Sequence, residues 1–294
     1  MKLFLRCQPH ATWVGVMADV GSRYLALPYP RMPKTPNAMD RLLRRLRGAE
    51  VLVDPHTPRS LKTLDKGGQR AALEFVGAYL DWVEMQLGAG LITLWGEPDL
   101  RHLLGRDGAR RVRDDVRNRG IGSSMVALAR ALPRNGVPAP PFSGRLDAHS
   151  FDEVRVALRG GFAAVGLAAR SPHTVRGSFL SHVLSDARST GTGLHAWGLG
   201  DRRALRHERW ASASTSSWRR GSWGGAVFWN TATRSLDLWK PPKGPRQLRE
   251  HYLVGEFRRR GLGARVEAGG LGAEDLDRWN AEQWVRLQDH LQRC

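Results

Sequence analysis

Short apolar segments alternate with longer stretches whose apolar residues recur at the helical period, and this alternation most constrains the fold. The apolar segments predict strands at Met1–Leu5, Val51–Val53, Gly90–Leu94, Ala163–Gly166, Gly193–Trp197 and Ala226–Trp229. The longer stretches predict helices at Asn37–Arg47, Gly68–Gln86, Ala109–Arg119, Phe151–Arg159, Val175–Asp186, Arg246–Arg260 and Ala273–Gln292. Strands and helices in turn are typical of β-α units around a parallel sheet, and not of a β-sandwich.

The length fits one such unit. A single (β/α)8 TIM-like barrel commonly occupies a chain of about this size, which is 294 residues here. The proline-rich stretch Pro133–Pro141 is a turn or loop inside the barrel, because the β-α alternation resumes beyond it. Lys240–Pro245 separates the last strand from the terminal helices. We therefore expect a single α/β domain, with a TIM-like barrel over 1–245 and C-terminal helices packed on it over 246–294.

The charge balance points to a class of partner. The chain has 46 Lys and Arg against 28 Asp and Glu, a formal net charge of +18. Such a surface raises the local concentration of polyanions, so nucleic acid is the first partner class to consider. A GC-rich genome that spells basic residues as Arg is the alternative explanation. It accounts for Arg over Lys, but not for the shortage of acidic residues.

Cysteine usage and the apolar runs bear on the compartment. Only Cys7 and Cys294 are present, so neither a disulfide framework nor a Cys-x-x-Cys zinc site can be built, and we expect no metal. The N-terminus lacks a basic region followed by a long apolar run, and no stretch approaches about 18 apolar residues. These observations favour a reducing, cytoplasmic location without membrane insertion.

Four blocks of sequence, in order along the chain, carry a resemblance. They are 51–60 (VLVDPHTPRS), 94–98 (LWGEP), 162–168 (FAAVGLA), and 195–200 (HAWGLG) followed by 210–218 (WASASTSSW). The order of these blocks and the spacing inside the last one resemble the phage and bacterial branch of the tRNA-guanine transglycosylase superfamily. Its DNA-acting members insert 7-deazaguanine bases.

The resemblance implies a barrel enzyme that exchanges a purine base with the help of two catalytic side chains. One carboxylate attacks the sugar C1′, and a second group manages the proton on the departing and arriving purines. Ser214 stands at the position of the attacking carboxylate, and Asp54 fits the acid/base role. Asp201, at another presumed strand end, could supply a displaced carboxylate. No cofactor is expected.

The same resemblance implies which residues meet the base. Thr93 stands where the family has a base-reading Asp, and Gly166 and Leu167 stand where family glycines let the base approach the backbone. His195 and Gly198 belong to the family's His-Gly block. The zinc-ligand cysteines of the tRNA-acting branch are absent, which favours DNA over tRNA as the partner, with a 7-deazapurine as the incoming base.

Each of these residues also has a structural alternative. Asp54 precedes Pro55 and could cap a turn, and Asp201 could cap a loop. His195 and His56 could be hydrogen-bonded structural residues at strand ends. Gly198-Leu199-Gly200 continues to Arg203 and so lacks the G-x-G-x-x-G pattern of a dinucleotide site.

A cluster rich in Trp and Arg follows the last block. Trp218, Arg219 and Arg220 combine an aromatic surface with guanidinium donors, which is what a splayed single strand or a flipped nucleotide requires. We expect this cluster to line a strand-binding mouth. The alternative is a Trp-rich edge of the core with solvated arginines.

Three functional hypotheses follow. The first is a base-exchanging transglycosylase acting on DNA or tRNA. The second is a catalytically inactive relative that binds nucleic acid or a partner enzyme; the absence of Asp at both Thr93 and Ser214 favours it. The third is a barrel enzyme acting on a small anionic substrate.

Overall fold

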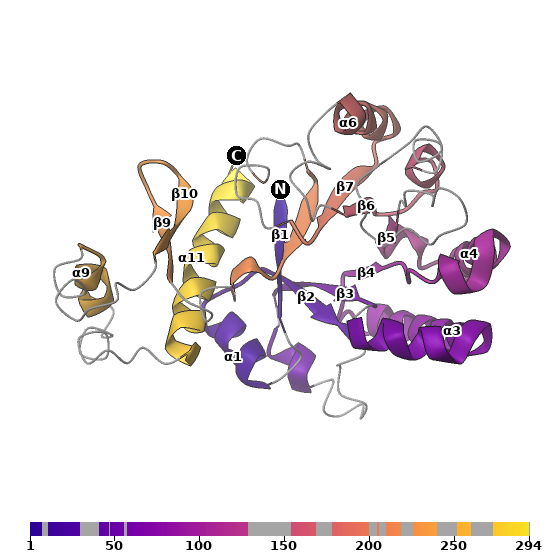
Figure 1. Cartoon of the computed structure of the whole chain (residues 1–294), viewed down its shortest axis with the longest axis horizontal. Coiled ribbons are helices and arrows are strands. Elements are labelled where there is room, and N and C mark those ends of the chain that lie inside the picture. Colours follow the sequence, from indigo (N-terminus) through magenta and orange to yellow (C-terminus); the bar gives the residue numbers. More distant parts are fainter. Residues whose placement is uncertain are drawn as a thin grey trace.

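The fold is seen in a computed structural model of the chain (Figure 1). It describes residues 1–7, 11–29, 41–46, 48–55, 58–128, 154–168, 178–199, 205, 210–218, 226–239, 252–259 and 273–293. Within this part of the chain, no helix is both long and apolar enough to cross a membrane.

Eight parallel strands close into a barrel. They are β1 (Lys2–Arg6), β2 (Tyr24–Pro28), β3 (Glu50–Asp54), β4 (Leu94–Gly96), β5 (Met125–Leu128), β6 (Ala164–Ala168), β7 (Gly193–Trp197) and β8 (Ser212–Thr215). Each strand pairs with the next in sequence, and β8 pairs with β1 to complete the circle. The predicted α/β barrel is confirmed.

Helices cover the outside of this barrel. They are α1 (Ala11–Asp19), α3 (Pro58–Gly88), α4 (Arg101–Asn118) and α6 (Ser178–Thr190), with a short 3-10 helix, η2 (Gly122–Ser124), before β5. Helices α3 and α4 lie side by side (Figure 1). Arg119, just after α4, ties them together by ion pairs to Asp81 and Glu84 of α3, at 2.7 and 3.0 Å.

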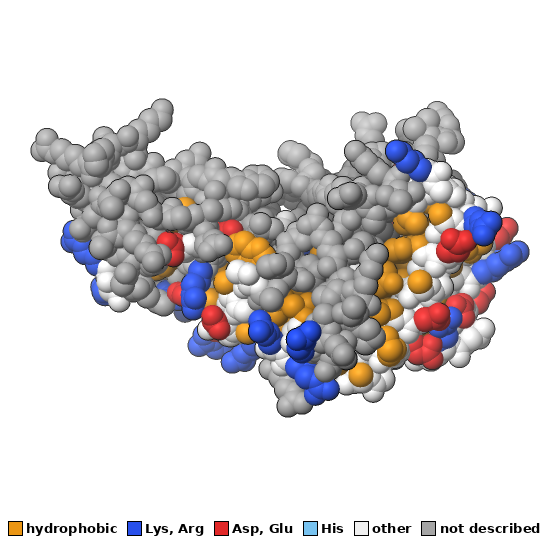
Figure 2. Space-filling view, turned by 90° about the horizontal axis from the view of Figure 1, so that it is seen from below, with side chains coloured by type: hydrophobic (Ala, Val, Ile, Leu, Met, Phe, Trp, Pro, Cys, Tyr) orange, Lys and Arg blue, Asp and Glu red, His pale blue; other side chains and the backbone are white. Residues whose placement is uncertain are grey.

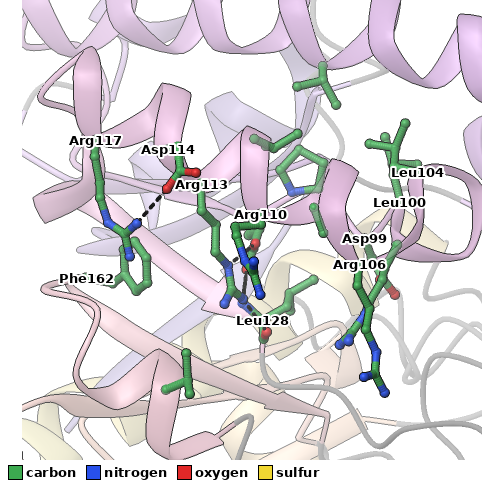
Figure 3. A pocket seen from close by; sticks show the side chains of 17 residues that line it. Asp99, Leu100, Leu104, Arg106, Arg110, Arg113, Asp114, Arg117, Leu128 and Phe162 are labelled. Atoms are coloured by element: carbon green, nitrogen blue, oxygen red, sulfur yellow. Dashed lines mark hydrogen bonds and ion pairs between the residues drawn. The ribbon is translucent and has the colours of Figure 1, made fainter.

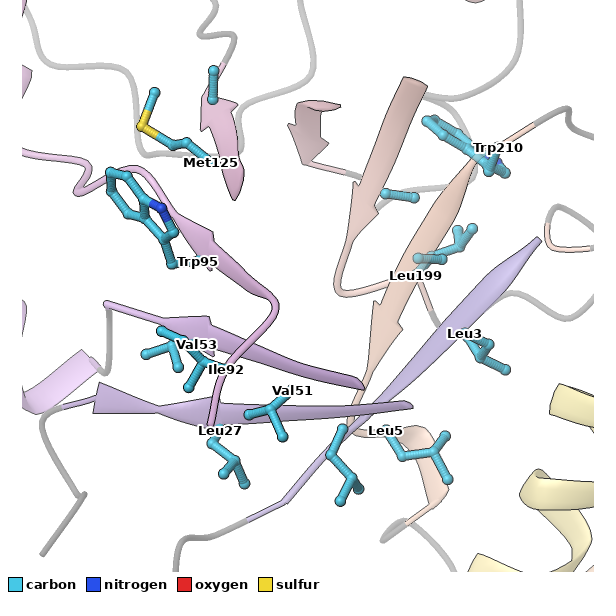
Figure 4. Close-up of a cluster of buried hydrophobic side chains, with 14 of the residues drawn as sticks. Leu3, Leu5, Leu27, Val51, Val53, Ile92, Trp95, Met125, Leu199 and Trp210 are labelled. Atoms are coloured by element: carbon cyan, nitrogen blue, oxygen red, sulfur yellow. The ribbon is translucent and has the colours of Figure 1, made fainter. Parts of the chain in front are cut away.

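The two faces of the strands have different chemistry, because successive side chains of a strand point to opposite sides. The outward side chains are aliphatic or aromatic and pack under the helices; Leu3, Leu5, Leu27, Val51, Val53 and Trp95 are among them (Figure 4). The inward side chains form a second, smaller core made of Phe4, Tyr24, Ala26, Leu52, Val126 and Ala164, with Leu94 and Trp197 packed against it. Polar inward residues are found at its two ends.

A hairpin and two helices follow the barrel. Strands β9 (Ala226–Asn230) and β10 (Ser235–Trp239) form an antiparallel pair, followed by α9 (Tyr252–Arg259) and α11 (Ala273–Arg293). Helix α11 lies between β1 and this hairpin (Figure 1). The strand expected at Ala226–Trp229 therefore forms, as β9, but it lies outside the barrel, which closes at Thr215 and not near 245.

Helix α11 satisfies the free edge of β9 with side chains. Asn280 Oδ1 and Gln283 Oε1 accept the backbone N–H groups of Val227 and Trp229, at 2.8 and 3.1 Å. Trp279 Nε1 donates to the Val227 carbonyl at 2.9 Å. These polar side chains occupy the apolar face of the helix because an unpaired strand edge needs partners when it is buried.

Candidate functional site at the mouth of the barrel

An ion pair stands at the carboxyl ends of two strands. Arg6 is the last residue of β1 and Asp54 the last of β3, and Arg6 Nη2 lies 2.9 Å from Asp54 Oδ2. Asp54 is buried, with 8% of its surface exposed. Barrel enzymes place their chemistry at this end, because loops following the strands converge there. Sequence reasoning identified Asp54 but missed Arg6.

A tryptophan lies across the same end. Built on Gly166 of β6, a Cβ atom would collide with Trp197 Nε1; on Gly96 of β4, it would come within 3.1 Å of the Trp197 ring. The indole therefore extends from β7 across β6 to β4, and glycines make room for it. Trp197 was missed as a site residue, although it is two positions after His195 and so faces the same side of β7.

His195 lies one layer deeper in the barrel. Its side chain has no exposed surface, its Nδ1 is 2.8 Å from Ser212 Oγ, and its ring contacts Trp197 with centroids 4.4 Å apart. Burial lowers the pKa of His195 to about 3. The imidazole is thus neutral in the folded protein and lies beneath Trp197, which corrects the expectation that it contacts a base.

This burial predicts acid sensitivity. Between about pH 6.5 and 3 the unfolded chain binds a proton at His195 that the folded protein does not, so folding free energy is lost as pH falls through this window. Compared with His195→Gln, the wild type should lose up to about 1.4 kcal/mol more stability per pH unit. Urea unfolding at several pH values measures both slopes. Parallel slopes would show that His195 is protonated in the folded state.

Ser214 and Gly198 lie together at the mouth. Ser214 is an inward residue of β8 beside Phe4 of β1, and 4% of it is exposed. Its Oγ accepts the N–H of Gly198 at 3.4 Å. Gly198 follows β7 with a φ of 70°, a conformation that favours glycine. Together with Asp54 and Gly166, these residues bring four separate segments to one end of the barrel.

Three expected site residues lie elsewhere. Thr93 precedes β4 and donates from Oγ1 to the Val51 carbonyl at 3.2 Å, so it is at the opposite end of the barrel from the mouth. Leu167 points outward into the aliphatic core. Trp218 is fully buried and donates from Nε1 to the Arg6 carbonyl at 2.9 Å, so its ring offers no face to a base. Asp201, Arg219, Arg220 and His56 lie outside the described residues.

The other inward and neighbouring carboxylates are committed to structural contacts. Glu50 pairs with Lys2 at 2.7 Å at the amino end of the barrel. Glu97, just after β4, accepts two bonds from Arg113 at 2.6 and 2.8 Å and the N–H of Leu128 at 2.6 Å. Among the inward strand residues that the structure describes, Asp54 is thus the single carboxylate at the mouth. In the described ranges, no cluster of three His, Cys, Asp or Glu could hold a metal.

The basic surface is partly neutralised where it is described. On the face shown in Figure 2, Lys and Arg side chains lie among Asp and Glu side chains. Ion pairs such as Arg155–Asp186 (2.8 Å) and Arg70–Glu74 (2.9 Å) are of this kind. A binding surface for an anion therefore has to be sought where arginines lack such partners.

Comparisons with known proteins identify no family for the chain. No protein-family model matches the chain, and no curated protein matches it. Similar solved structures include a designed cube-shaped protein cage made of fused oligomeric domains (12% identity, 74% of this chain, 64% of that chain, TM-score 0.39). The 3-dehydroquinate dehydratase from Aquifex aeolicus VF5 gives 14% identity over 73% of this chain and 88% of that chain, with a TM-score of 0.39. A mandelate racemase homologue from Mesorhizobium loti gives 15% identity over 73% of this chain and 50% of that chain, with a TM-score of 0.38.

The chain thus spans less than two thirds of the length of the first and third of these proteins. None of the three is described as a transglycosylase. The barrel fold rests on the closed parallel sheet, β1 through β8, and not on these low scores.

Proposed function

We propose that this protein receives an unpaired base of a nucleic-acid strand at the carboxyl mouth of the barrel and exchanges it for another purine. The observation that carries the proposal is the convergence of Asp54, Gly166, Gly198 and Ser214 on that mouth. These residues come from the blocks that resemble the base-exchanging transglycosylases. The expected strand is DNA, and the expected incoming base is a 7-deazaguanine.

Asp54 is the group best suited to the chemistry. Base exchange moves a proton from the arriving purine to the departing one, and a carboxylate at the mouth can carry it. The guanidinium of Arg6 lies 2.9 Å from the Asp54 carboxylate and holds it at the mouth. At Gly166 the space in front of the backbone is filled by the Trp197 indole, so a flat ring reaches the strands there only if the indole moves aside.

A second candidate is a protein that binds the strand without exchanging a base. Two observations favour it. Trp197 occupies the space beside Gly166, and a hydroxyl, Ser214, stands where the resembling enzymes have a carboxylate. A serine glycoside would be an ordinary acetal, which forms and breaks slowly.

Mass spectrometry of nucleosides separates the two candidates. DNA and tRNA from cells with and without the gene are digested, and a 7-deazaguanine that depends on the gene supports exchange. Binding of a strand without any modified nucleoside supports the second candidate. If the protein binds no strand and no modified nucleoside depends on the gene, the remaining hypothesis is an enzyme that acts on a small anionic substrate.

The structure supplies a matched pair of variants for the exchange assay. Asp54→Asn should lower exchange by about 10²–10⁴-fold, because an amide cannot carry the proton. Glu50→Gln is the control, since it removes a carboxylate and its ion pair at the opposite end of the barrel. Equal exchange by the wild type and Asp54→Asn would exclude Asp54 from the reaction.

A further inference from the structure

A groove of about 440 Å³ lies beside the mouth, on the outside of β4 and β5 (Figure 3). Helix α4 forms one wall. The segment after β4, including Glu97 and Leu100, and the end of β5 at Leu128 form the rest, together with Phe162. Because Glu97 and Leu128 stand at the carboxyl ends of their strands, the groove opens at the same end of the barrel as Asp54.

Five arginines of α4 line this groove, Arg101 before Gly105 and four others after it. Arg106, Arg110, Arg113 and Arg117 are spaced by four, three and four residues, which places them on one face of the helix. Gly105 has a φ of 68° and interrupts the helix just before them. Arg106 therefore begins a new helical segment, whose first N–H groups and positive dipole end add to the attraction for an anion.

Two of the four arginines after Gly105 are already neutralised. Arg113 is held by Glu97 and also donates to the Leu128 carbonyl at 3.0 Å. Arg117 pairs with Asp114 at 2.8 Å. Both guanidinium groups also lie over the Phe162 ring, at 5.7 and 5.9 Å from its centroid, so this end of the groove is fixed.

Arg106 and Arg110 are different. Both are exposed, and neither makes a hydrogen bond or ion pair with any residue that the structure describes. They lie about one helical turn, or roughly 5.4 Å, apart on the groove wall. Of the carboxylates that line the groove, Glu97 is held by Arg113 and Leu128, Asp114 is paired with Arg117, and Asp99 makes no hydrogen bond or ion pair with Arg106 or Arg110. The groove thus offers two guanidinium groups beside the apolar side chains Leu100 and Leu104.

We infer that this groove binds the phosphate backbone of the nucleic-acid strand whose base enters the mouth. The inference rests on the proposed function, since it takes the strand as the ligand. A guanidinium pair one turn apart suits successive phosphodiesters, and the apolar wall suits the sugars between them. Arg106 and Arg110 position the strand and take no part in exchange.

The test compares two arginine faces of the same helix. Binding of a fluorescein-labelled oligothymidylate to the full chain is measured by anisotropy for the wild type, Arg106→Gln/Arg110→Gln and the control Arg111→Gln. Arg111 is an exposed arginine of α4 that does not line the groove. The titrations are repeated at several salt concentrations from about 50 to 200 mM.

The double variant should bind roughly tenfold or more weakly, and the slope of log affinity against log salt should become shallower by about 1.4, for two phosphates fewer. Arg111→Gln should change affinity by less than about twofold. Three results would each reject the inference that the groove binds the strand. They are wild-type affinity in the double variant, an equal loss of affinity in Arg111→Gln, and no oligothymidylate binding by the wild type.

The exchange assay keeps this inference separate from the proposed function. If strand binding depends on Arg106 and Arg110 but no deazaguanine depends on the gene, the groove remains the strand-binding site and base exchange is rejected. Exchange with unchanged strand affinity in the double variant would retain the function and reject the groove.

Discussion

Ser214→Asp should raise base exchange by several orders of magnitude above the wild type. A carboxylate at this position can form a glycosyl ester at C1′, which is itself a good leaving group, whereas the serine hydroxyl cannot. Ser214 faces into the barrel beside Phe4 of β1, and its Oγ accepts the Gly198 N–H. A carboxylate in its place retains an acceptor for that N–H and adds a second acidic group inside the barrel.

The measurement is release of labelled guanine from an oligonucleotide in the presence of 7-deazaguanine. Ser214→Asn is the matched control, because it has the size of Asp without its nucleophilic charge, and Ser214→Ala should change little. Strong wild-type exchange that survives Ser214→Ala would show that another residue attacks the sugar. A folded Ser214→Asp protein that binds the strand but exchanges nothing would favour the binding protein.

Trp218→Ala should destabilise the protein by about 3–5 kcal/mol, the range for removing a fully buried large aromatic side chain. The indole packs edge-on against Trp13 of α1, with centroids 5.8 Å apart, and donates to the Arg6 carbonyl. Its loss leaves a cavity and deprives that carbonyl of its partner. Urea unfolding monitored by circular dichroism measures the change.

Trp218→Phe is the control for this prediction. It keeps most of the packing and removes the hydrogen bond to Arg6, so it should cost less than the alanine variant. If Trp218→Ala has wild-type stability and binds an oligonucleotide about 1–3 kcal/mol more weakly, the result would instead support the sequence-based hypothesis that a base stacks on Trp218.

Trp218 also bears on the mouth. Its hydrogen-bond partner, Arg6, is the residue whose guanidinium holds Asp54. The segment after β8 thus fixes the end of β1, and β1 in turn orients the carboxylate. We expect Trp218→Phe to lower the rate of base exchange by a larger factor than it lowers the fraction of folded protein.

The alternation of apolar and amphipathic segments was enough to predict the class of fold. Parallel strands covered by helices are buried on both faces, and they leave apolar runs that can be recognised without knowing their neighbours. Three strands were nevertheless missed. Strand β8, Ser212–Thr215, has one apolar residue, Ala213, because its inward Ser212 contacts polar His195 on the neighbouring strand β7. Strands β2 and β5, Tyr24–Pro28 and Met125–Leu128, were missed although they have five and four residues, against five in the predicted β1 and β3.

The sequence also predicted that Asp54, Gly166 and Gly198 lie at or near strand ends, since each ends or follows a predicted strand, whereas Ser214 was placed by the resemblance alone. It could not assign the faces reliably, because a shift of one residue turns a side chain to the opposite face of a strand. Thr93 was expected to meet the base because the resemblance sets it at the position of a base-reading Asp, but β4 begins only at Leu94, so Thr93 lies before the strand.

Only the tertiary structure determined which distant residues contact each other. Arg6 of β1 reaches Asp54 of β3 past β2, and Trp197 of β7 extends over Gly166 to Gly96 of β4, because the closed barrel turns these side chains toward one interior. Trp218 was recognised as part of a Trp-rich segment, but its burial depends on α1 and on the carbonyl of Arg6, 212 residues away. The periodicity of a helix or strand follows from backbone geometry and can be recognised among residues that are close in the sequence. These contacts instead arise from closure of the sheet, and they join residues with no regular spacing in the chain.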